Sequence, residues 1–349
     1  MLRLNRLRQH ASTVLALAAG ALALVAGLVF AAHAVGASAK RPHHSVPSNH
    51  RLKTTIAARA RVGGSIVIRL HDRWNLGGIR LTICLTPPGG RRACTRWYLR
   101  AGRPRRVVRI GVARPGGWHV TALSPYGARK DQQVWVSHPG GRIRVLAAGD
   151  SEMQILDTFI AQDAARYGVS VTSDARISTG LTNSFFFDWP RHARAQAATL
   201  QPDATVFFIG ANDGFSVPGP GGHQVGCCGA GWSMGYANRV AEMMRIYLRG
   251  ESGRVYWFVL PTPRPANFQR LFNAVNAGIR IAARRFPGRV ALIDANAFFT
   301  PGNRYRDFMV YHGRGFVIHE PDGIHLSTAA DQIDASFVVT RMLEDRLIR

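Results

Sequence analysis

The chain has 349 residues, of which 46% are hydrophobic, and its 45 Lys and Arg residues against 20 Asp and Glu residues give a formal net charge of +25. The mean hydropathy of -0.04 excludes a protein with many membrane spans, and the apolar fraction excludes a chain that is disordered throughout. The length suits two globular domains.

Most of the excess positive charge belongs to the first part of the chain. Residues 1–148 contain 25 Lys and Arg residues and two acids, Asp72 and Asp131, whereas residues 149–349 contain 20 basic residues against 18 acids. All but three of the basic residues are Arg. This bias indicates either that the Arg side chains bind anionic groups or that the composition is rich in Arg without any binding partner being involved.

Residues 1–39 are predicted to be a signal peptide or a signal anchor. Arg3, Arg6 and Arg8 precede an uncharged run over residues 11–39, which is typical of an export signal. Its apolar part approaches the roughly 20 residues that span a bilayer, whereas two A-x-A patterns near its end favour cleavage. Both alternatives place the rest of the chain outside the cytoplasm, with membrane contact through residues 11–39 if the signal is uncleaved.

A polar stretch rich in Pro, His and Ser follows over residues 40–54 and is predicted to be a linker. From residue 55 to residue 140, short β-rich runs alternate with Gly and Pro, which is typical of a small antiparallel sandwich. This module is only loosely similar to bacterial immunoglobulin-like domains. The expected strands are residues 65–70, 79–85, 95–100, 106–112, 118–123 and 133–137.

The four cysteines agree with an oxidising compartment. Cys84 and Cys94 lie in two β-like runs joined by a Pro-Pro-Gly-Gly turn, so a disulfide across this hairpin is expected. Cys227 and Cys228 are adjacent in a Gly-rich loop, and they either form a vicinal bridge or stay free. Because no Cys/His spacing of a metal site is present, no metal is expected.

From residue 142 to residue 349, apolar strands alternate with helices, which predicts a parallel sheet covered on both faces. In such sheets ligands bind just beyond the carboxyl ends of the strands. The expected strands are residues 143–148, 169–172, 204–209, 254–260 and 290–294, and the expected helices are residues 153–167, 191–200, 235–249, 268–286 and 328–347.

Three short motifs follow the first three of these strands. Ser151 of Gly-Asp-Ser opens a helix, where an unpaired N–H and the helix dipole favour a nucleophile; a plain N-cap serine is the alternative. Gly180 lets the backbone come close to a ligand and offer an N–H. Asn212 puts a side-chain amide at the same edge, as a candidate oxyanion donor or as part of a turn.

A fourth motif precedes the last helix. Asp322 stands three residues before His325, a spacing that lets the carboxylate orient the imidazole while the imidazole takes a serine proton. A surface Asp and His would have the same spacing. Residues 214–232 are expected to border the pocket, and residues 300–320 either line an acyl or sugar pocket or form an irregular surface connection.

Together the four motifs resemble the SGNH (GDSL-like) hydrolase family over about residues 142–347. The resemblance implies a flavodoxin-like, three-layer domain with a parallel five-stranded sheet. The chain departs from the family where Glu152 and Met153 follow the serine in place of the commoner leucine. The implied catalytic residues are Ser151, His325 and Asp322, and the implied oxyanion hole is formed by Ser151, Gly180 and Asn212.

The resemblance and the export signal together predict an exported serine esterase that needs no cofactor. The expected substrate is an acyl ester, and above all an acetyl ester, of cell-envelope or extracellular carbohydrate. The alternatives are an O-acyltransferase on envelope glycans and a lipase or thioesterase for longer acyl chains. The basic N-terminal half is a candidate binder of an anionic envelope polymer, and nucleic acid is not expected as a partner because no recognition motif is present.

Overall fold

The computed structural model describes residues 52–74, 77–124, 128–219 and 222–348. The predicted export signal over residues 1–39, and residues 40–51 of the predicted linker, lie outside these ranges. None of the helices within the described ranges is long and apolar enough to cross a membrane.

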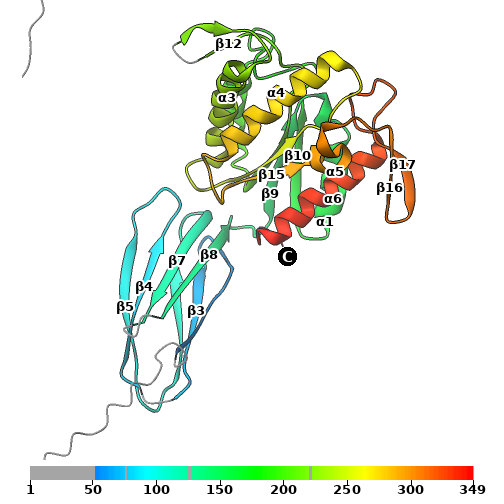
Figure 1. The fold of residues 1–349 in the computed structure, drawn as a ribbon. Coiled ribbons are helices and arrows are strands. Elements are labelled where there is room, and N and C mark those ends of the chain that lie inside the picture. Colours follow the sequence, from blue (N-terminus) through cyan, green and yellow to red (C-terminus); the bar gives the residue numbers. More distant parts are fainter. Residues whose placement is uncertain (1–51, 75–76, 125–127, 220–221, 349) are drawn as a thin grey trace, which may run out of the picture. The chain divides into compact units, whose positions relative to one another are not determined.

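Residues 52–137 form an all-β module of two sheets (Figure 1). Its core lies between the sheets, because Ile66, Ile68 and Leu70 alternate with outward-facing residues along one strand and pack into one apolar cluster with Leu81 and Ile83 of the other sheet. One sheet has the order β1 (Leu52–Ile56), β3 (Ser65–Asp72) and β6 (Arg105–Gly111); the other has the order β2 (Arg59–Arg61), β8 (Arg129–Ser137), β7 (Gly116–Leu123), β4 (Ile79–Thr86) and β5 (Ala93–Leu99).

Two details of this module bear on the sequence predictions. Strand β1 begins at Leu52, so the end of the predicted linker is wrong: residues 52–54 pair with residues 70–72 of β3 in an antiparallel ladder. The predicted disulfide is present, because Cys84 and Cys94 are directly opposite in the β4–β5 register, with Cα atoms 4.0 Å apart.

Beyond residue 142 the chain forms the predicted parallel sheet. Its strand order is β10-β9-β11-β14-β15, the flavodoxin-like order in which the first strand in sequence lies between the second and the third. The strands are β9 (Ile143–Gly149), β10 (Val169–Ala175), β11 (Ala204–Phe208), β14 (Arg254–Val259) and β15 (Val290–Asp294).

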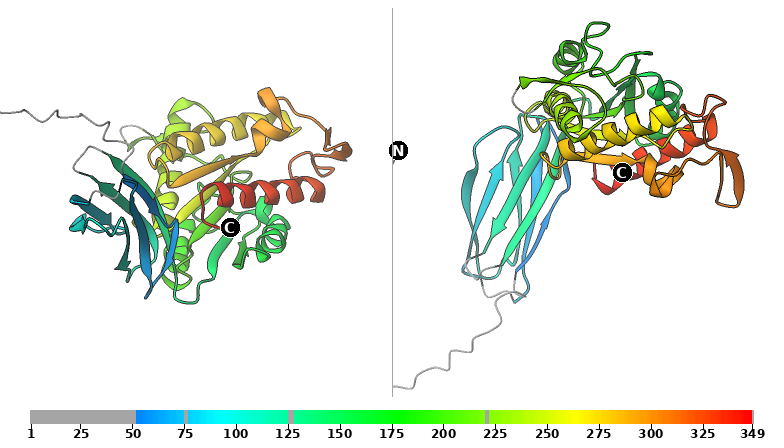
Figure 2. Two further views of the ribbon diagram at one scale, coloured as in Figure 1. Left: turned by 90° about the horizontal axis from the view of Figure 1, so that it is seen from below. Right: turned by 45° about the horizontal axis from the view of Figure 1, so that its top comes forward.

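Helices cover both faces of this sheet (Figures 1 and 2). The pair α1 (Leu156–Ala165) and α6 (Thr328–Glu344) packs together on one face. The other three long helices, α2 (Trp189–Thr199), α3 (Ala230–Leu248) and α4 (Ala266–Ala283), pack side by side on the other face. The predicted three-layer α/β fold is therefore confirmed.

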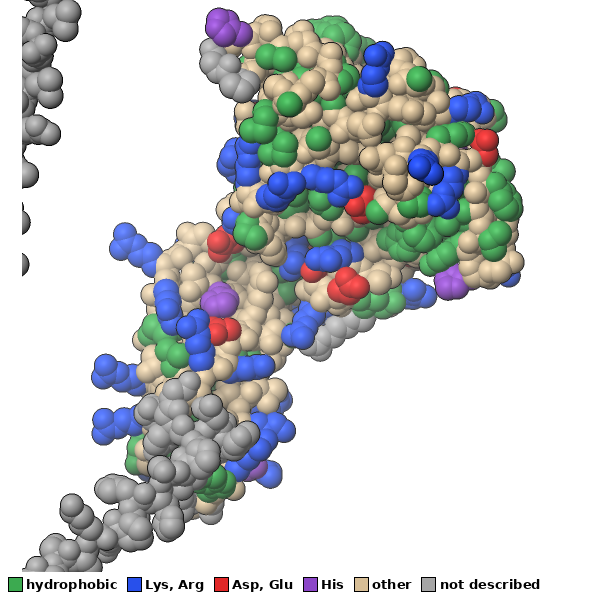
Figure 3. Space-filling view, in the orientation of Figure 1, with side chains coloured by type: hydrophobic (Ala, Val, Ile, Leu, Met, Phe, Trp, Pro, Cys, Tyr) green, Lys and Arg blue, Asp and Glu red, His purple; other side chains and the backbone are tan. Residues whose placement is uncertain are grey.

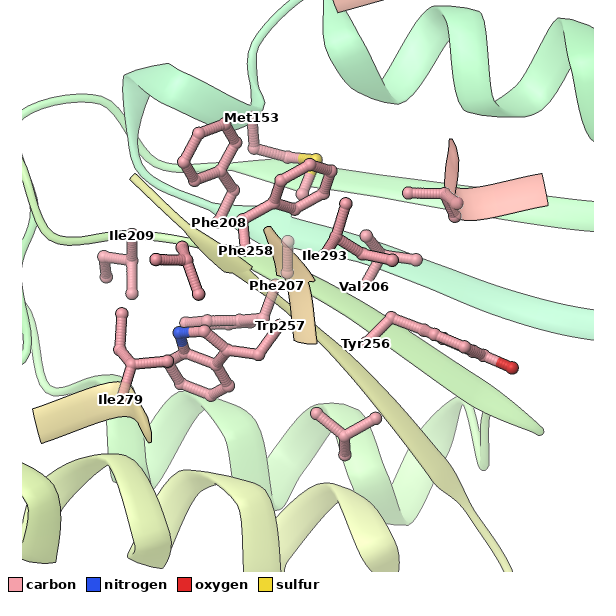
Figure 4. Close-up of a cluster of buried hydrophobic side chains, with 14 of the residues drawn as sticks. Met153, Val206, Phe207, Phe208, Ile209, Tyr256, Trp257, Phe258, Ile279 and Ile293 are labelled. Atoms are coloured by element: carbon pink, nitrogen blue, oxygen red, sulfur yellow. The ribbon is translucent and has the colours of Figure 1, made fainter. Parts of the chain in front are cut away.

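The central strands read as continuous hydrophobic runs because helices bury both of their sides. Every residue of β11 and β14 is buried. The rings of Phe207 and Trp257 pack at 4.7 Å, and those of Phe208 and Phe258 stack at 4.5 Å on the opposite face of the sheet (Figure 4). This core fixes the strand ends from which the predicted site residues project.

Some element boundaries differ from the predictions. The helix expected from residue 153 starts at Leu156, after a 3₁₀ turn over Ser151–Met153. Residues 300–320 are not irregular throughout: they contain a 3₁₀ turn (Pro301–Asn303) and a hairpin of β16 (Phe308–Tyr311) and β17 (Arg314–Val317). Apart from this hairpin and its 3₁₀ turn, five short elements were not predicted: β1, β2, β12 (Val217–Pro218), β13 (Gln224–Val225) and helix α5 (Ala295–Phe299).

Candidate active site

The first, second and third motifs follow the adjacent strands β9, β10 and β11 and so share one edge of the sheet. Gly149 ends β9 so close to β11 that a Cβ on it would overlap the carbonyl oxygen of Phe208, which explains the glycine. Ser151 then opens the 3₁₀ turn directly above this edge. This edge contains a topological switch point, because β10 and β11 lie on opposite sides of β9, and ligands bind at such points in open α/β sheets.

Ser151, His325 and Asp322 form a continuous hydrogen-bonded relay. The hydroxyl of Ser151 donates to Nε2 of His325 at 2.8 Å, and Nδ1 of His325 donates to Oδ2 of Asp322 at 2.6 Å. Serine and histidine are 174 residues apart in the sequence, so the fold alone brings them together. The imidazole is held between a hydroxyl donor and a carboxylate acceptor, and the bond to the carboxylate fixes its tautomer.

The turn that carries Asp322 and His325 is locked by its own backbone. Oδ1 of Asp322 accepts the N–H groups of Ile324 at 2.8 Å and of His325 at 3.1 Å, so both carboxylate oxygens are occupied. Helix α6 starts immediately afterwards, where the Ser327 hydroxyl accepts the N–H of Ala330. His325 is thereby fixed relative to a long helix.

Hydrogen bonding decides the protonation state of Asp322. Partial burial by itself raises the pKa of this carboxyl, but the bonds from the His325 ring and from the two backbone N–H groups outweigh it, so the pKa lies below its ordinary value. Asp322 is therefore ionised at neutral pH and is able to stabilise an imidazolium. The His325 side chain is 37% exposed, which leaves it open to a reactant.

Asp150 joins the first motif to the third. It is fully buried; its Oδ1 accepts the N–H of Glu152 at 3.0 Å, and its Oδ2 accepts the N–H of Gly210 at 3.0 Å and lies 3.5 Å from Nδ2 of Asn212. Burial raises the pKa of Asp150 to about 7, against the effect of the two backbone bonds. The structure thus ties Ser151 and Asn212 to one buried side chain.

Gly180 and Asn212 lie against each other. A Cβ on Gly180 would come within 3.0 Å of the Asn212 carbonyl oxygen and 2.8 Å of Asp213 Oδ1, so close packing explains this glycine. Asp213 is buried and accepts bonds from the N–H and hydroxyl of Thr182 and from the hydroxyl of Tyr236. Burial raises its pKa to about 6. The loop after β10 is thereby fastened to the loop after β11.

A cavity of about 440 Å³ opens beside the relay. Ser151, Asp322 and His325 line it, as does Ser178 from the loop that carries Gly180, whereas Gly180 and Asn212 themselves do not. The cavity also has three carboxylates to which the four motifs assign no role: Glu152, Glu320 and Asp331. The sequence contained a sign that Asp331 is buried. Asp331 and Asp334 have the same helical spacing as the apolar residues on the buried face of α6, which include Ala330, Ala335 and Val338.

The two segments expected to shape the pocket contribute less than predicted. No described residue of 214–232 lines the cavity beside Ser151; the segment packs instead on α3, where the Trp232 indole N–H donates to the Phe215 carbonyl. Of residues 300–320 only Glu320 lines this cavity, because the β16–β17 hairpin packs against α6. Cys227 and Cys228 form a disulfide and line a separate cavity with Asn267 and Arg270 of α4.

Within the described ranges no three Asp, Glu, His or Cys side chains converge so as to hold a metal ion. The site brings together a serine hydroxyl, an imidazole and a carboxylate, with backbone N–H groups and an amide nearby.

Comparisons with known proteins give one family and many distant structural likenesses, two of which are described here. The catalytic domain of the peptidoglycan O-acetyltransferase A (OatA) from Streptococcus pneumoniae is 12% identical with a TM-score of 0.38, covering 60% of this chain and 96% of that one. A family two carbohydrate esterase from Clostridium thermocellum is 13% identical with a TM-score of 0.37, covering 82% and 93%. At such TM-scores neither likeness bears on function.

No curated protein sequence matches this chain. A family described as "Protein of unknown function (DUF459)" matches residues 144–341, which span more than half of the chain and include all four motifs. The chain therefore belongs to the DUF459 family.

Proposed function

We propose that this chain is a serine esterase of the SGNH type, with Ser151 as nucleophile, His325 as general base and Asp322 as the residue that orients the imidazole. The observation that carries the proposal is the continuous relay of two hydrogen bonds, at 2.8 and 2.6 Å, that opens into a cavity. Nucleophile, base and orienting group within hydrogen-bond reach are the geometric signature of covalent acyl transfer.

In the first half of the reaction, Ser151 Oγ attacks the ester carbonyl carbon while its proton passes to Nε2 of His325. The tetrahedral intermediate collapses when the carbon–oxygen bond to the alcohol breaks, and His325 returns the proton to the leaving oxygen. The alcohol leaves and the acyl group stays on Ser151. Asp322, ionised and bonded to Nδ1, stabilises the imidazolium during this step.

In the second half, water replaces the alcohol. His325 takes a proton from the water, whose oxygen attacks the acyl carbon, and the bond to Ser151 Oγ then breaks as Oγ regains the proton. The net reaction consumes one ester and one water and yields one acid and one alcohol. No cofactor enters this scheme.

The proposed oxyanion hole consists of the backbone N–H groups of Ser151 and Gly180 and the side-chain amide of Asn212. Its support is indirect: Asp150 links Asn212 to the serine turn, and Gly180 packs on Asn212. Neither Gly180 nor Asn212 lines the cavity. In this proposal the two donors therefore meet the oxyanion at the inner end of the cavity. Loss of one such donor typically costs about 10²–10³ in rate.

The remaining parts of the proposal rest on the sequence. The basic, apolar N-terminus supports an extracytoplasmic protein, secreted or anchored, and export supports acetyl or other acyl esters of envelope or extracellular carbohydrate as substrates. We also propose the division of the chain into an export signal, a linker, a β module and a hydrolase domain. Transfer of the acyl group to a sugar hydroxyl is the second candidate, favoured by the 37% exposure of His325, which lets an acceptor reach the base.

The test is an ester panel of increasing acyl length with purified wild type and Ser151→Ala. The proposal expects hydrolysis by wild type, a loss of at least about 10³-fold in Ser151→Ala and no loss in the control Ser173→Ala, a change of an exposed serine on β10. Addition of a glycan acceptor separates the two candidates, since only a transferase yields an acylated glycan. Equal rates of hydrolysis for Ser151→Ala and wild type would show that Ser151 is not the nucleophile.

A further inference from the structure

The cavity beside Ser151 is acidic, although the chain carries a net charge of +25. Its lining includes four carboxylates, Glu152, Glu320, Asp322 and Asp331. None of the described residues that line it is a Lys or an Arg. Asp322 is committed to His325. The other three carboxylates take no part in the proposed mechanism, so their presence needs another explanation.

Two of these three carboxyl groups belong to buried residues, and one of them has a buried oxygen without a partner. Glu152 and Asp331 are each 4% exposed. Glu152 Oε1 has no hydrogen-bond partner, and no partner of the Asp331 carboxylate is found among the described residues. Behind them on α6, Asp334 is fully buried with both oxygens unpaired. Buried, unpaired carboxyls cost folding free energy, and groups retained at such a cost are characteristic of functional sites.

The pKa shifts of these carboxyl groups indicate that a positive charge is missing beside them. Burial raises the pKa of Glu152 well above its usual range, and the nearby Asp150, Asp331, Asp322 and Asp334 raise it further. Burial, with Glu320 and Asp157, raises the pKa of Asp331 to about 8. The neighbouring side chains that contribute most to these two shifts are all acids. A cation in the cavity would relieve this repulsion.

The cavity is unsuited to a metal ion but suited to an organic cation. The described acids do not converge so as to hold a metal. Ile155, Ile177 and Leu326 line the same cavity as Glu152 and Asp331, which gives apolar walls for the carbon atoms around a positive nitrogen. Carboxylates with apolar walls match an alkylammonium group.

We propose that this cavity binds a positively charged amino or quaternary ammonium group, and that the ester substrate therefore carries such a group close to its scissile carbonyl. The substrate class depends on the proposed role of Ser151, because the same cavity holds the Ser151–His325 pair. The cation belongs either to the acyl part, as in an aminoacyl ester, or to the alcohol part, as in an amino alcohol or an amino sugar.

Two isosteric pairs of esters test the proposal and separate these sources. Acetylcholine and 3,3-dimethylbutyl acetate differ in the charge of the alcohol, and alanine methyl ester and methyl isobutyrate differ in the charge of the acyl group. At pH 7, below the α-amino pKa of about 7.7–8.0, we expect the charged member of one pair to have a kcat/KM roughly ten- to a hundredfold higher, the range for one hydrogen bond or ion contact to a charged group. Equal rates within both pairs would overturn the proposal.

Two variants localise the effect. Asp331→Asn and Glu152→Gln keep the shape of the side chain and remove its ability to ionise beside a bound cation, and each is expected to lower the preference for the charged ester at least about threefold. The matched control is Glu344→Gln, which removes an exposed charge from the same helix and should leave the preference unchanged. A preference that persists undiminished in both cavity variants would contradict the assignment.

A binding measurement separates this proposal from the proposed function. Calorimetric titration of Ser151→Ala with choline and with 3,3-dimethylbutanol needs no turnover, and we expect choline to bind more tightly and Asp331→Asn to abolish the difference. Choline binding without any Ser151-dependent hydrolysis would support the cation site and contradict the proposed esterase function. Ser151-dependent hydrolysis without a preference for charged esters would contradict the cation site and leave the proposed esterase function intact.

Discussion

The carboxylate of Asp150 accepts a hydrogen bond from the backbone N–H of Gly210 at 3.0 Å, across 60 residues of sequence. This bond connects the end of β9 to the end of β11, and it places the turn that carries Ser151 beside the loop that carries Asn212. The geometry at the proposed nucleophile and at one proposed oxyanion donor thus depends on a buried side chain that does not line the cavity.

Asp150→Asn is expected to lower kcat by roughly ten- to a hundredfold with little change in KM, because an amide cannot accept all the bonds that the carboxylate accepts. The unfolding free energy should fall by about 1–3 kcal/mol, since a buried donor is left unpaired. Steady-state kinetics and urea denaturation measure the two effects, with Asp163→Asn on α1 as control. A stable variant with unchanged kcat would contradict a positioning role.

Asp322→Asn should separate catalysis from stability. The side chain is 43% exposed, so its replacement is expected to change the unfolding free energy by less than about 1 kcal/mol. The activity should nevertheless fall by about 10³–10⁴, because the amide cannot hold the required tautomer and charge of His325. The comparison of kcat with the thermal midpoint checks this. A variant that loses stability and keeps its kcat would show that Asp322 is structural.

The buried Asp331 should make stability depend on pH. Its folded pKa of about 8 exceeds the ordinary value of 3.8, so the folded state keeps a proton that the unfolded state releases. The contribution of this group to stability is complete below about pH 4 and is lost as the pH rises toward 8.

Asp331→Asn removes this dependence. Its unfolding free energy relative to wild type is expected to increase by at least about 1.4 kcal/mol, the value of one pKa unit, between pH 4 and pH 8. Thermal or urea unfolding at pH 4, 6 and 8 provides the measurement. A difference between the two proteins that stays constant over this range would show that Asp331 does not hold its proton.

Much of the α/β fold could be predicted because the alternation of apolar strands and helices is strong there. The four motifs stand at strand ends, so Ser151, Asp322 and His325 could be placed near one another before any coordinates were known. The two hydrogen bonds show that these three side chains meet, whereas the catalytic roles of all three, like those of Gly180 and Asn212, stay predictions.

The features that the sequence did not reveal are those that depend on long-range packing. The start of β1 at Leu52 depends on pairing with β3, which a polar local sequence does not indicate. The described residues of 214–232 do not line the cavity, and the Trp232 indole N–H instead donates to the Phe215 carbonyl within this segment. The position of Glu152 next to Asp331 joins two segments far apart in the chain, so only the fold shows that the cavity is acidic.

The disulfide of the β module should stabilise that module without affecting catalysis. Cys84 and Cys94 cross-link adjacent strands β4 and β5, far in sequence from the motifs. The double variant Cys84→Ser/Cys94→Ser is expected to lose about 2–4 kcal/mol of unfolding free energy and to keep the wild-type kcat. Denaturation and kinetics of the purified protein test both parts. A large fall in kcat with the protein still folded would contradict this separation.

The arginines of the β module are expected to bind anionic polymer. Arg105 and Arg109 of β6 are exposed on one face of the strand, and basic side chains outnumber acidic ones over this module (Figure 3). Arg105→Gln/Arg109→Gln should reduce retention of the full chain on anionic wall polymer, and salt should weaken the retention of wild type. The control Arg191→Gln/Arg284→Gln removes equal charge elsewhere. Retention that is insensitive to salt would argue against an electrostatic role.

The central claim is that Ser151 forms the covalent acyl-enzyme, and peptide mass spectrometry after treatment with a sulfonyl fluoride tests it most directly. The account predicts one adduct, on the peptide that contains Ser151, with loss of activity in proportion to labelling, and no adduct in Ser151→Ala or His325→Ala. An adduct on another residue, or full labelling of an enzyme that stays active, would contradict it.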